Sequence, residues 1–106
     1  MAKIDFSSPI LDLAGKQISV VTSLEPNADR IPATLAVVCI EALLSPLRGD
    51  SPSGEVKMTR FELARKIHNG GEVSLSVDEL SSLKHLVGLA WPALIQGATW
   101  ELLDPK

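Results

Sequence analysis

The single cysteine, Cys39, and the two histidines, His68 and His85, belong to residue types that act as nucleophiles or metal ligands. Cys39 lies between Val38 and Ile40, and an apolar setting hides a thiol and raises its pKa. The two histidines lie on different expected helices and lack the further ligands that a metal site needs. We therefore expect a buried structural cysteine, surface histidines and no metal.

The sequence also lacks the short motifs that bind phosphates or activate a nucleophile. It contains no glycine-rich phosphate loop, no nucleophile elbow and no HExxH pair. We therefore expect no catalytic residues, no cofactor and no enzymatic activity.

Length and composition define the kind of molecule in which the other residues act. A chain of 106 residues, with 45% hydrophobic and 22% charged residues, is typical of one folded domain over residues 1–106. The net charge of −3 gives no general attraction to nucleic acid or to an anionic membrane. No apolar run is long enough for a membrane span or a signal peptide, so we expect a cytoplasmic location.

The amino-terminal region, residues 1–21, has the character of short β-strands. Polar and apolar side chains alternate over residues 3–6, and two further apolar runs, residues 10–13 and 17–21, flank Gly15. Glycine supplies the positive φ of a tight reversal, so we predict a β-hairpin here. Residues 22–33 carry prolines and charges without periodicity, which predicts a loop.

The rest of the chain predicts four helices, over residues 34–45, 55–69, 77–90 and 92–103, with an extended link over residues 72–75. Thr34, Ser53 and Ser76 are placed to cap three of the helices, and Glu79 completes a capping box with Ser76. An isolated hairpin is only marginally stable and must rest on other elements. We therefore predict an α+β fold, mainly α, with an amino-terminal β-hairpin packed on a four-helix bundle over residues 34–103.

The distribution of apolar residues predicts which helix faces are buried. The helix over residues 34–45 is apolar on all sides, which places it at the centre or leaves one face for another subunit. We therefore expect self-association, most simply as a dimer. For the two last helices the predicted buried stripes are Val77, Leu80, Leu83, Val87 and Trp91, and then Trp91, Leu94, Ile95, Ala98 and Leu102.

Two apolar pairs fall outside the predicted core stripes: Trp100 with Leu103, and Met58 with Phe61. Residues three apart lie side by side on a helix surface. Large apolar side chains left outside a core are typical of interfaces, so we predict that these four residues bind a partner. The alternative is that the amino-terminal hairpin or the loop over residues 23–32 covers them.

Basic residues gather on the second predicted helix: Lys57, Arg60, Arg65, Lys66 and His68. They suggest an alternative function, a small regulator of a DNA transaction. The helical rotation of about 100° per residue scatters these side chains around the axis. No aromatic platform or helix-turn-helix spacing accompanies them, so a solvated helix surface is the interpretation that we favour.

Several segments, taken in order, resemble small proteins encoded by tailed phages and prophages. They are Ile-Asp-Phe and Asp-Leu-Ala-Gly-Lys, then Glu-Ala-Leu-Leu, Arg-Phe-Glu-Leu-Ala-Arg-Lys-Ile-His-Asn-Gly and Val-Ser-Leu-Ser-Val-Asp-Glu-Leu. The likeness covers nearly the whole chain and concerns structural motifs, so it transfers no functional residue. It implies an accessory protein in the cytoplasm of an infected bacterium and leaves its role open. We expect a non-enzymatic role in protein–protein interaction, with phage structural proteins or further copies of the chain as partners, during head or tail assembly.

Overall fold

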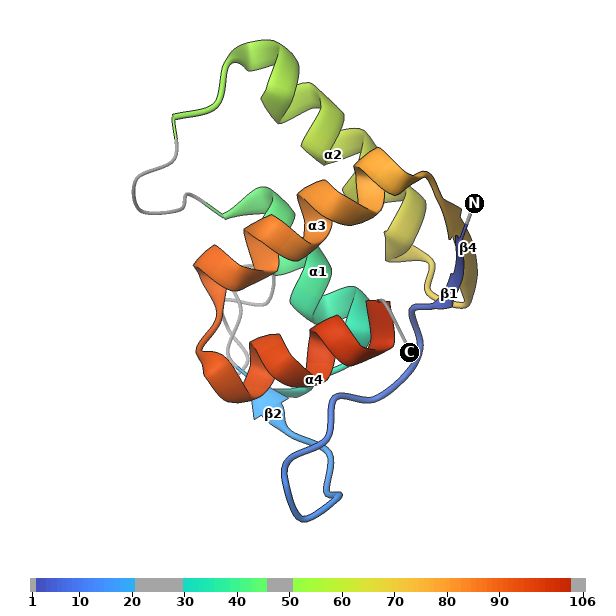
Figure 1. Ribbon diagram of the computed structural model, residues 1–106, viewed down its shortest axis with the longest axis vertical. Helices are drawn as coiled ribbons and strands as arrows, with labels where there is room; N and C mark the ends of the chain where they lie inside the picture. The colour runs from blue at the N-terminus through green and yellow to red at the C-terminus, as the bar shows by residue number, and fades with distance from the viewer. Residues whose placement is uncertain (1, 21–29, 46–50, 104–106) are drawn as a thin grey trace.

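The computed structural model describes residues 2–20, 30–45 and 51–103 of the chain (Figure 1). In these residues short strands and turns are followed by four helices, namely α1 (Leu35–Leu44), α2 (Gly54–His68), α3 (Val77–Ala90) and α4 (Ala93–Leu103). Each helix begins and ends within one residue of its predicted position. The predicted fold class, α+β and mainly α, is confirmed.

Local capping explains where the helices begin and end. The side-chain oxygens of Thr34, Ser53 and Ser76 each accept a hydrogen bond from the backbone N–H three residues later. Glu79 Oε1 accepts the Ser76 N–H at 2.9 Å, which completes the predicted capping box. Beyond α2 the chain turns through Gly70 at φ 69°, a conformation that glycine adopts without a steric penalty.

The strands pair differently from the predicted hairpin. β1 (Ala2–Asp5) pairs antiparallel with β4 (Glu72–Leu75), the segment predicted as an extended link. β2 (Ser19–Val20) pairs with β3 (Ile31–Pro32), inside the segment predicted as a loop. The pairing of β1 with β4 joins residues about 70 apart, which alternation along one strand does not reveal.

The predicted reversal at Gly15 is present, and its arms are short. Leu11 forms a single antiparallel bridge with Gln17, and Gly15 has φ 82°. The Asp12 N–H donates to Lys16 O at 2.8 Å and closes the turn. We call residues 9–18 the hairpin segment. Residue 21 of the predicted second arm and residues 22–29 of the predicted loop lie outside the described residues.

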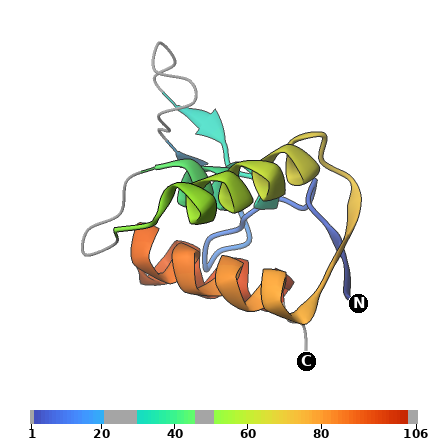
Figure 2. The same ribbon diagram turned by 90° about the horizontal axis from the view of Figure 1, so that it is seen from above.

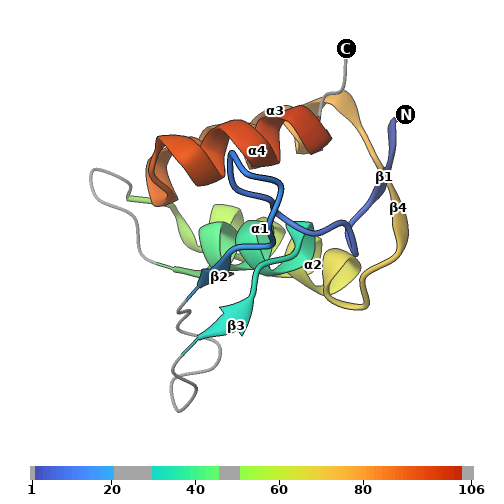
Figure 3. The ribbon, with the colours of Figure 1, turned by 90° about the horizontal axis from the view of Figure 1, so that it is seen from below.

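The helices form two layers, α1 with α2 and α3 with α4 (Figure 2). The hairpin segment crosses the open side between α1 and α4 (Figure 3). Helix α1 is the central element, which is one of the two placements expected from its apolar residues, because it packs against α2, α3 and α4. No helix among the described residues is long and apolar enough to cross a membrane.

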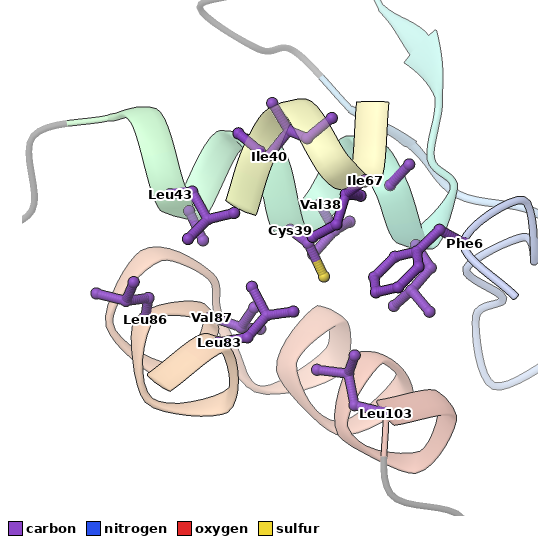
Figure 4. Close-up of a cluster of buried hydrophobic side chains, with 14 of the residues drawn as sticks. Phe6, Val38, Cys39, Ile40, Leu43, Ile67, Leu83, Leu86, Val87 and Leu103 are labelled. Carbon is purple, nitrogen blue, oxygen red and sulfur yellow. The ribbon is translucent and has the colours of Figure 1, made fainter. Parts of the chain in front are cut away.

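The core lies between the layers, where side chains of α1 meet those of α3 and α4 (Figure 4). Val38 and Cys39 point from α1 toward Leu83 and Val87 of α3. Phe6, which follows β1, closes one end of this cluster and is fully buried. The amino-terminal segment therefore contributes to the core as well as to the surface.

The predicted stripes on the last two helices need correction. Val77 is 81% exposed, because it is the first residue of α3, and Leu86 is buried beside Leu83 and Val87 instead. On α4 the buried residues are Ile95, Thr99 and Leu103. These three residues recur every four positions and define a face that is rotated by about one residue from the predicted stripe. The pattern of hydrophobic residues does not indicate this face, because the buried Thr99 is polar.

Candidate functional site

A groove of about 580 Å³ runs along the junction of α1 and α2, and we call it the α1/α2 groove. Its floor is apolar and includes the buried residues Phe6, Ile40 and Ala64. Its edge includes Leu44 of α1 and Phe61 of α2, and the Phe61 side chain is 45% exposed. An apolar floor with half-exposed apolar edges is typical of a surface that binds an apolar segment of another protein.

The α2 edge of the groove carries one cationic side chain, Arg65. The guanidinium carbon of Arg65 lies 5.7 Å from the centroid of the Phe61 ring, in a cation–π contact. His68 also lines the groove and is exposed. None of the described lining residues is an aspartate or a glutamate. The groove therefore suits a partner whose apolar side chains are flanked by carboxylates.

Phe6 is placed in the groove floor by the backbone around it. Its N–H donates to Gly71 O at 2.8 Å, and its carbonyl accepts the N–H of Ala36 at 2.9 Å. These bonds tie residue 6 to the chain beyond α2 and to the start of α1. Sequence reasoning missed Phe6 as a groove residue, because the two residues to which its backbone is hydrogen-bonded, Ala36 and Gly71, are distant in sequence.

Met58 extends the exposed edge by one helical turn. Met58, Phe61, Arg65 and His68 recur at helical spacing along one side of α2, and Met58 is 52% exposed. The predicted pair Met58 and Phe61 therefore lies at the surface of the described structure. Whether these residues bind a partner stays a prediction.

The predicted pair Trp100 and Leu103 is placed differently, and this corrects the expectation that both face outward. Leu103 is 1% exposed and points into the core with Phe6 and Val38 (Figure 4). Trp100 is half-buried, and its Nε1–H donates to Lys84 O of α3 at 3.1 Å. The Lys84 ammonium lies 5.1 Å from the Trp100 ring centroid. Leu103 is therefore a core residue, and Trp100 joins α4 to α3.

A second hollow, of about 400 Å³, lies between the hairpin segment and α4. Apolar and small side chains line it, with Leu11 on the hairpin segment and Leu94 and Ala98 on α4. Leu13 lies at its edge and is 97% exposed. Sequence reasoning did not select Leu13, although a leucine within the turn Asp-Leu-Ala-Gly is unusual for a position where polar residues prevail.

The basic residues of α2 are interleaved with acidic ones. Lys66 Nζ lies 3.4 Å from Glu79 Oε1 of α3. A hollow between α2 and α3 is lined by both Arg60 and Lys66 and by Asp78 and Glu79. Phosphate binding needs a continuous basic surface. On this side of the described helix α2, acidic side chains lie between the basic ones and interrupt such a surface.

The cysteine and the two histidines lie apart from one another: Cys39 is in the core, His68 lines the α1/α2 groove and His85 lines the hollow between α2 and α3. Cys39 is fully buried, as predicted, and burial raises the pKa of its thiol. His68 and His85 are both exposed. Within residues 2–20, 30–45 and 51–103, no group of three His, Cys, Asp or Glu side chains is arranged to hold a metal ion.

Comparison of the chain with protein-family models, with curated proteins and with solved structures finds no match.

Proposed function

We propose that this protein is a non-enzymatic phage or prophage accessory protein that binds another protein through the α1/α2 groove. The observation that carries the proposal is the exposed edge of the groove, with Phe61 over an apolar floor and Arg65 beside it. A helix with apolar side chains along one face and acidic residues beside them fits this surface. The resemblance to phage proteins supports a role in head or tail assembly in the cytoplasm of an infected bacterium.

The binding part of the proposal is tested by substitution in the groove. Tagged protein is co-expressed with each head or tail protein encoded near its gene, and the affinity of the captured partner is measured. Phe61→Gln removes the aromatic ring and introduces a residue with a high helix propensity, so the helix should persist while binding weakens by about tenfold or more. Val77→Gln is the matched control, since Val77 is exposed outside the groove. Equal binding by Phe61→Gln and the parent protein would exclude the groove.

The assembly role is tested in the bacterium that carries the gene. Deletion should reduce the yield of complete particles seen by electron microscopy, and the Val77→Gln protein should restore it while Phe61→Gln should not. An unchanged particle yield after deletion would contradict the phage proposal.

The dependence of binding on salt concentration distinguishes this proposal from the alternative function, a small regulator of a DNA transaction. Binding that rests on phosphate contacts weakens steeply between low and moderate salt, whereas binding in an apolar groove changes little. A steep salt dependence together with loss of binding in Lys57→Gln would favour the DNA function.

We further propose that the protein self-associates, with a dimer as the simplest form. Sedimentation over a range of concentrations tests this, and a monomer mass at high micromolar protein would contradict it.

A further inference from the structure

Helix α4 lacks the local stabilisation that the other three helices have. A serine or threonine precedes and caps each of α1, α2 and α3, whereas Pro92 precedes α4 and its side chain has no hydrogen-bonding atom. Gly97 lies in the middle of α4, where glycine is less favourable than alanine, and a Cβ there would meet no atom within 4 Å. Glu101 lies in the last turn, where a negative charge opposes the helix dipole. The helix therefore depends on its packing against the rest of the molecule.

The packed face of α4 contains a polar group that has no partner. Thr99 is fully buried, and its Oγ1 has no hydrogen-bond partner in the part of the chain that the structure describes. The hydroxyl binds water when the helix is detached, so its burial opposes the docking of α4. Docking is favoured by Ile95 and Leu103, which are buried on the same face, and by the hydrogen bond from Trp100 Nε1 to Lys84 O. The apolar contacts of α4 are thus partly offset at the centre of its own interface.

Helix α4 covers apolar side chains of the central cluster. Cys39 of α1 is fully buried and belongs to the same cluster as Val87 of α3 and Leu103 of α4, and its sulfur points toward these two helices (Figure 4). The link from α3 into α4 is anchored, because the Trp91 Nε1–H donates to Val38 O at 3.0 Å. A movement of α4 away from α1 therefore has a fixed pivot, and it uncovers this part of the cluster.

We infer that α4 is a releasable cover. In a minor state it leaves the core as a unit, turning about the link at Trp91 and Pro92, and exposes Cys39 while α1, α2 and α3 stay folded. The uncovered face consists of the apolar side chains of α1 and α3 that α4 buries, which is the kind of surface that an amphipathic helix of another protein binds. The inference is independent of the α1/α2 groove and of the proposed self-association.

Labelling of Cys39, the only cysteine of the chain, with a thiol reagent reports the opening. The reagent reacts only when Cys39 is exposed, so the labelling rate measures the population of open molecules. This rate should depend weakly on urea at low concentrations and steeply only near global unfolding, because the release of one helix exposes little surface. A rate that follows global unfolding over the whole range of urea would overturn the inference.

Two stabilising substitutions in α4 test which helix controls the labelling. Thr99→Val removes the unpartnered hydroxyl and Gly97→Ala raises the helix propensity, so each should slow the labelling without urea by about threefold or more. Gly54→Ala makes the same change at an open position of α2 and is the matched control. It should leave the rate unchanged, whereas exposure through global unfolding would respond to both helices alike. Unchanged labelling in both α4 variants would overturn the inference.

Hydrogen exchange identifies the element that opens. The backbone amides of α4 should exchange faster than those of α1 and α3, because only α4 separates from the core in the open state. Equal protection of α3 and α4 would show that the two helices open together, and it would overturn the release of α4 alone.

Discussion

Helices α2 and α4 each carry an apolar pair at a spacing of three residues, and the two pairs end in different environments. Met58 and Phe61 are about half-exposed, whereas Leu103 is buried and Trp100 is half-buried. Helix α4 packs on both α3 and α1, while α2 packs chiefly on α1. A helix with two packed neighbours has a wider buried face. The same sequence pattern therefore contributes to the core on one helix and to the exposed surface on the other.

The largest effect is expected from Leu103. Leu103→Ala removes a buried side chain and leaves a cavity, so it should lower the free energy of unfolding by about 2–5 kcal/mol. Leu94→Ala on the same helix is the matched control and should cost less, because Leu94 is 43% exposed. Chemical denaturation measures both. Similar midpoints for the two variants would mean that the Leu103 side chain is not buried.

A smaller loss is expected from Trp100. Trp100→Phe keeps an aromatic ring at the boundary of α3 and α4 and removes the N–H that donates to Lys84 O. The free energy of unfolding should fall by about 0.5–1.5 kcal/mol, the net contribution of one hydrogen bond. Binding to a partner should be unchanged. A Trp100→Phe variant that is as stable as the parent protein but no longer binds the partner would support the original prediction that Trp100 contacts a partner.

The contact between α2 and α3 at Glu79 should make a modest contribution that depends on pH. The Ser76 N–H and, to a smaller extent, the Lys66 ammonium hold the pKa of Glu79 below its ordinary value, against a desolvation that raises it. A carboxyl group whose pKa is lowered by folding stabilises the folded state at pH values above the ordinary glutamate pKa. This stabilisation is lost as the pH falls through the lowered pKa. The effect is small because the pair is partly exposed.

Glu79→Gln isolates this contribution, because glutamine keeps the capping hydrogen bond and does not titrate. The parent should be more stable than the variant at neutral pH, and the gap should close in acid, as measured by denaturation at both pH values. A gap independent of pH would show that the charge of Glu79 is not involved.

The smallest change in stability is expected from the exposed pair on α2. Met58→Gln and Phe61→Gln should each change the free energy of unfolding by less than about 1 kcal/mol, because exposed positions of a helix tolerate a good helix former. Denaturation and partner binding are measured on the same samples. A loss as large as that of Leu103→Ala would place Phe61 in the core and remove the contrast between the two helices.

Sequence analysis recovered the parts of this fold that depend on neighbours in the chain. The caps at Thr34, Ser53 and Ser76 are formed within one turn of helix, and the turn at Gly15 within five residues. The burial of Cys39 follows from the apolar residues on both sides of it. Of the candidate site, the sequence identified Met58 and Phe61, because an apolar pair outside a stripe can be read from helical spacing alone.

The rest depended on contacts between residues that are distant in the chain. Only the tertiary structure pairs β1 with β4, turns α4 so that Thr99 and Leu103 are buried, and brings Phe6 into the same groove as Phe61. Leu13 is exposed because of where the hairpin segment crosses α4, which no local pattern records. Helix caps and tight turns depend on interactions between residues a few positions apart, whereas the buried face of a helix depends on which other helices cover it.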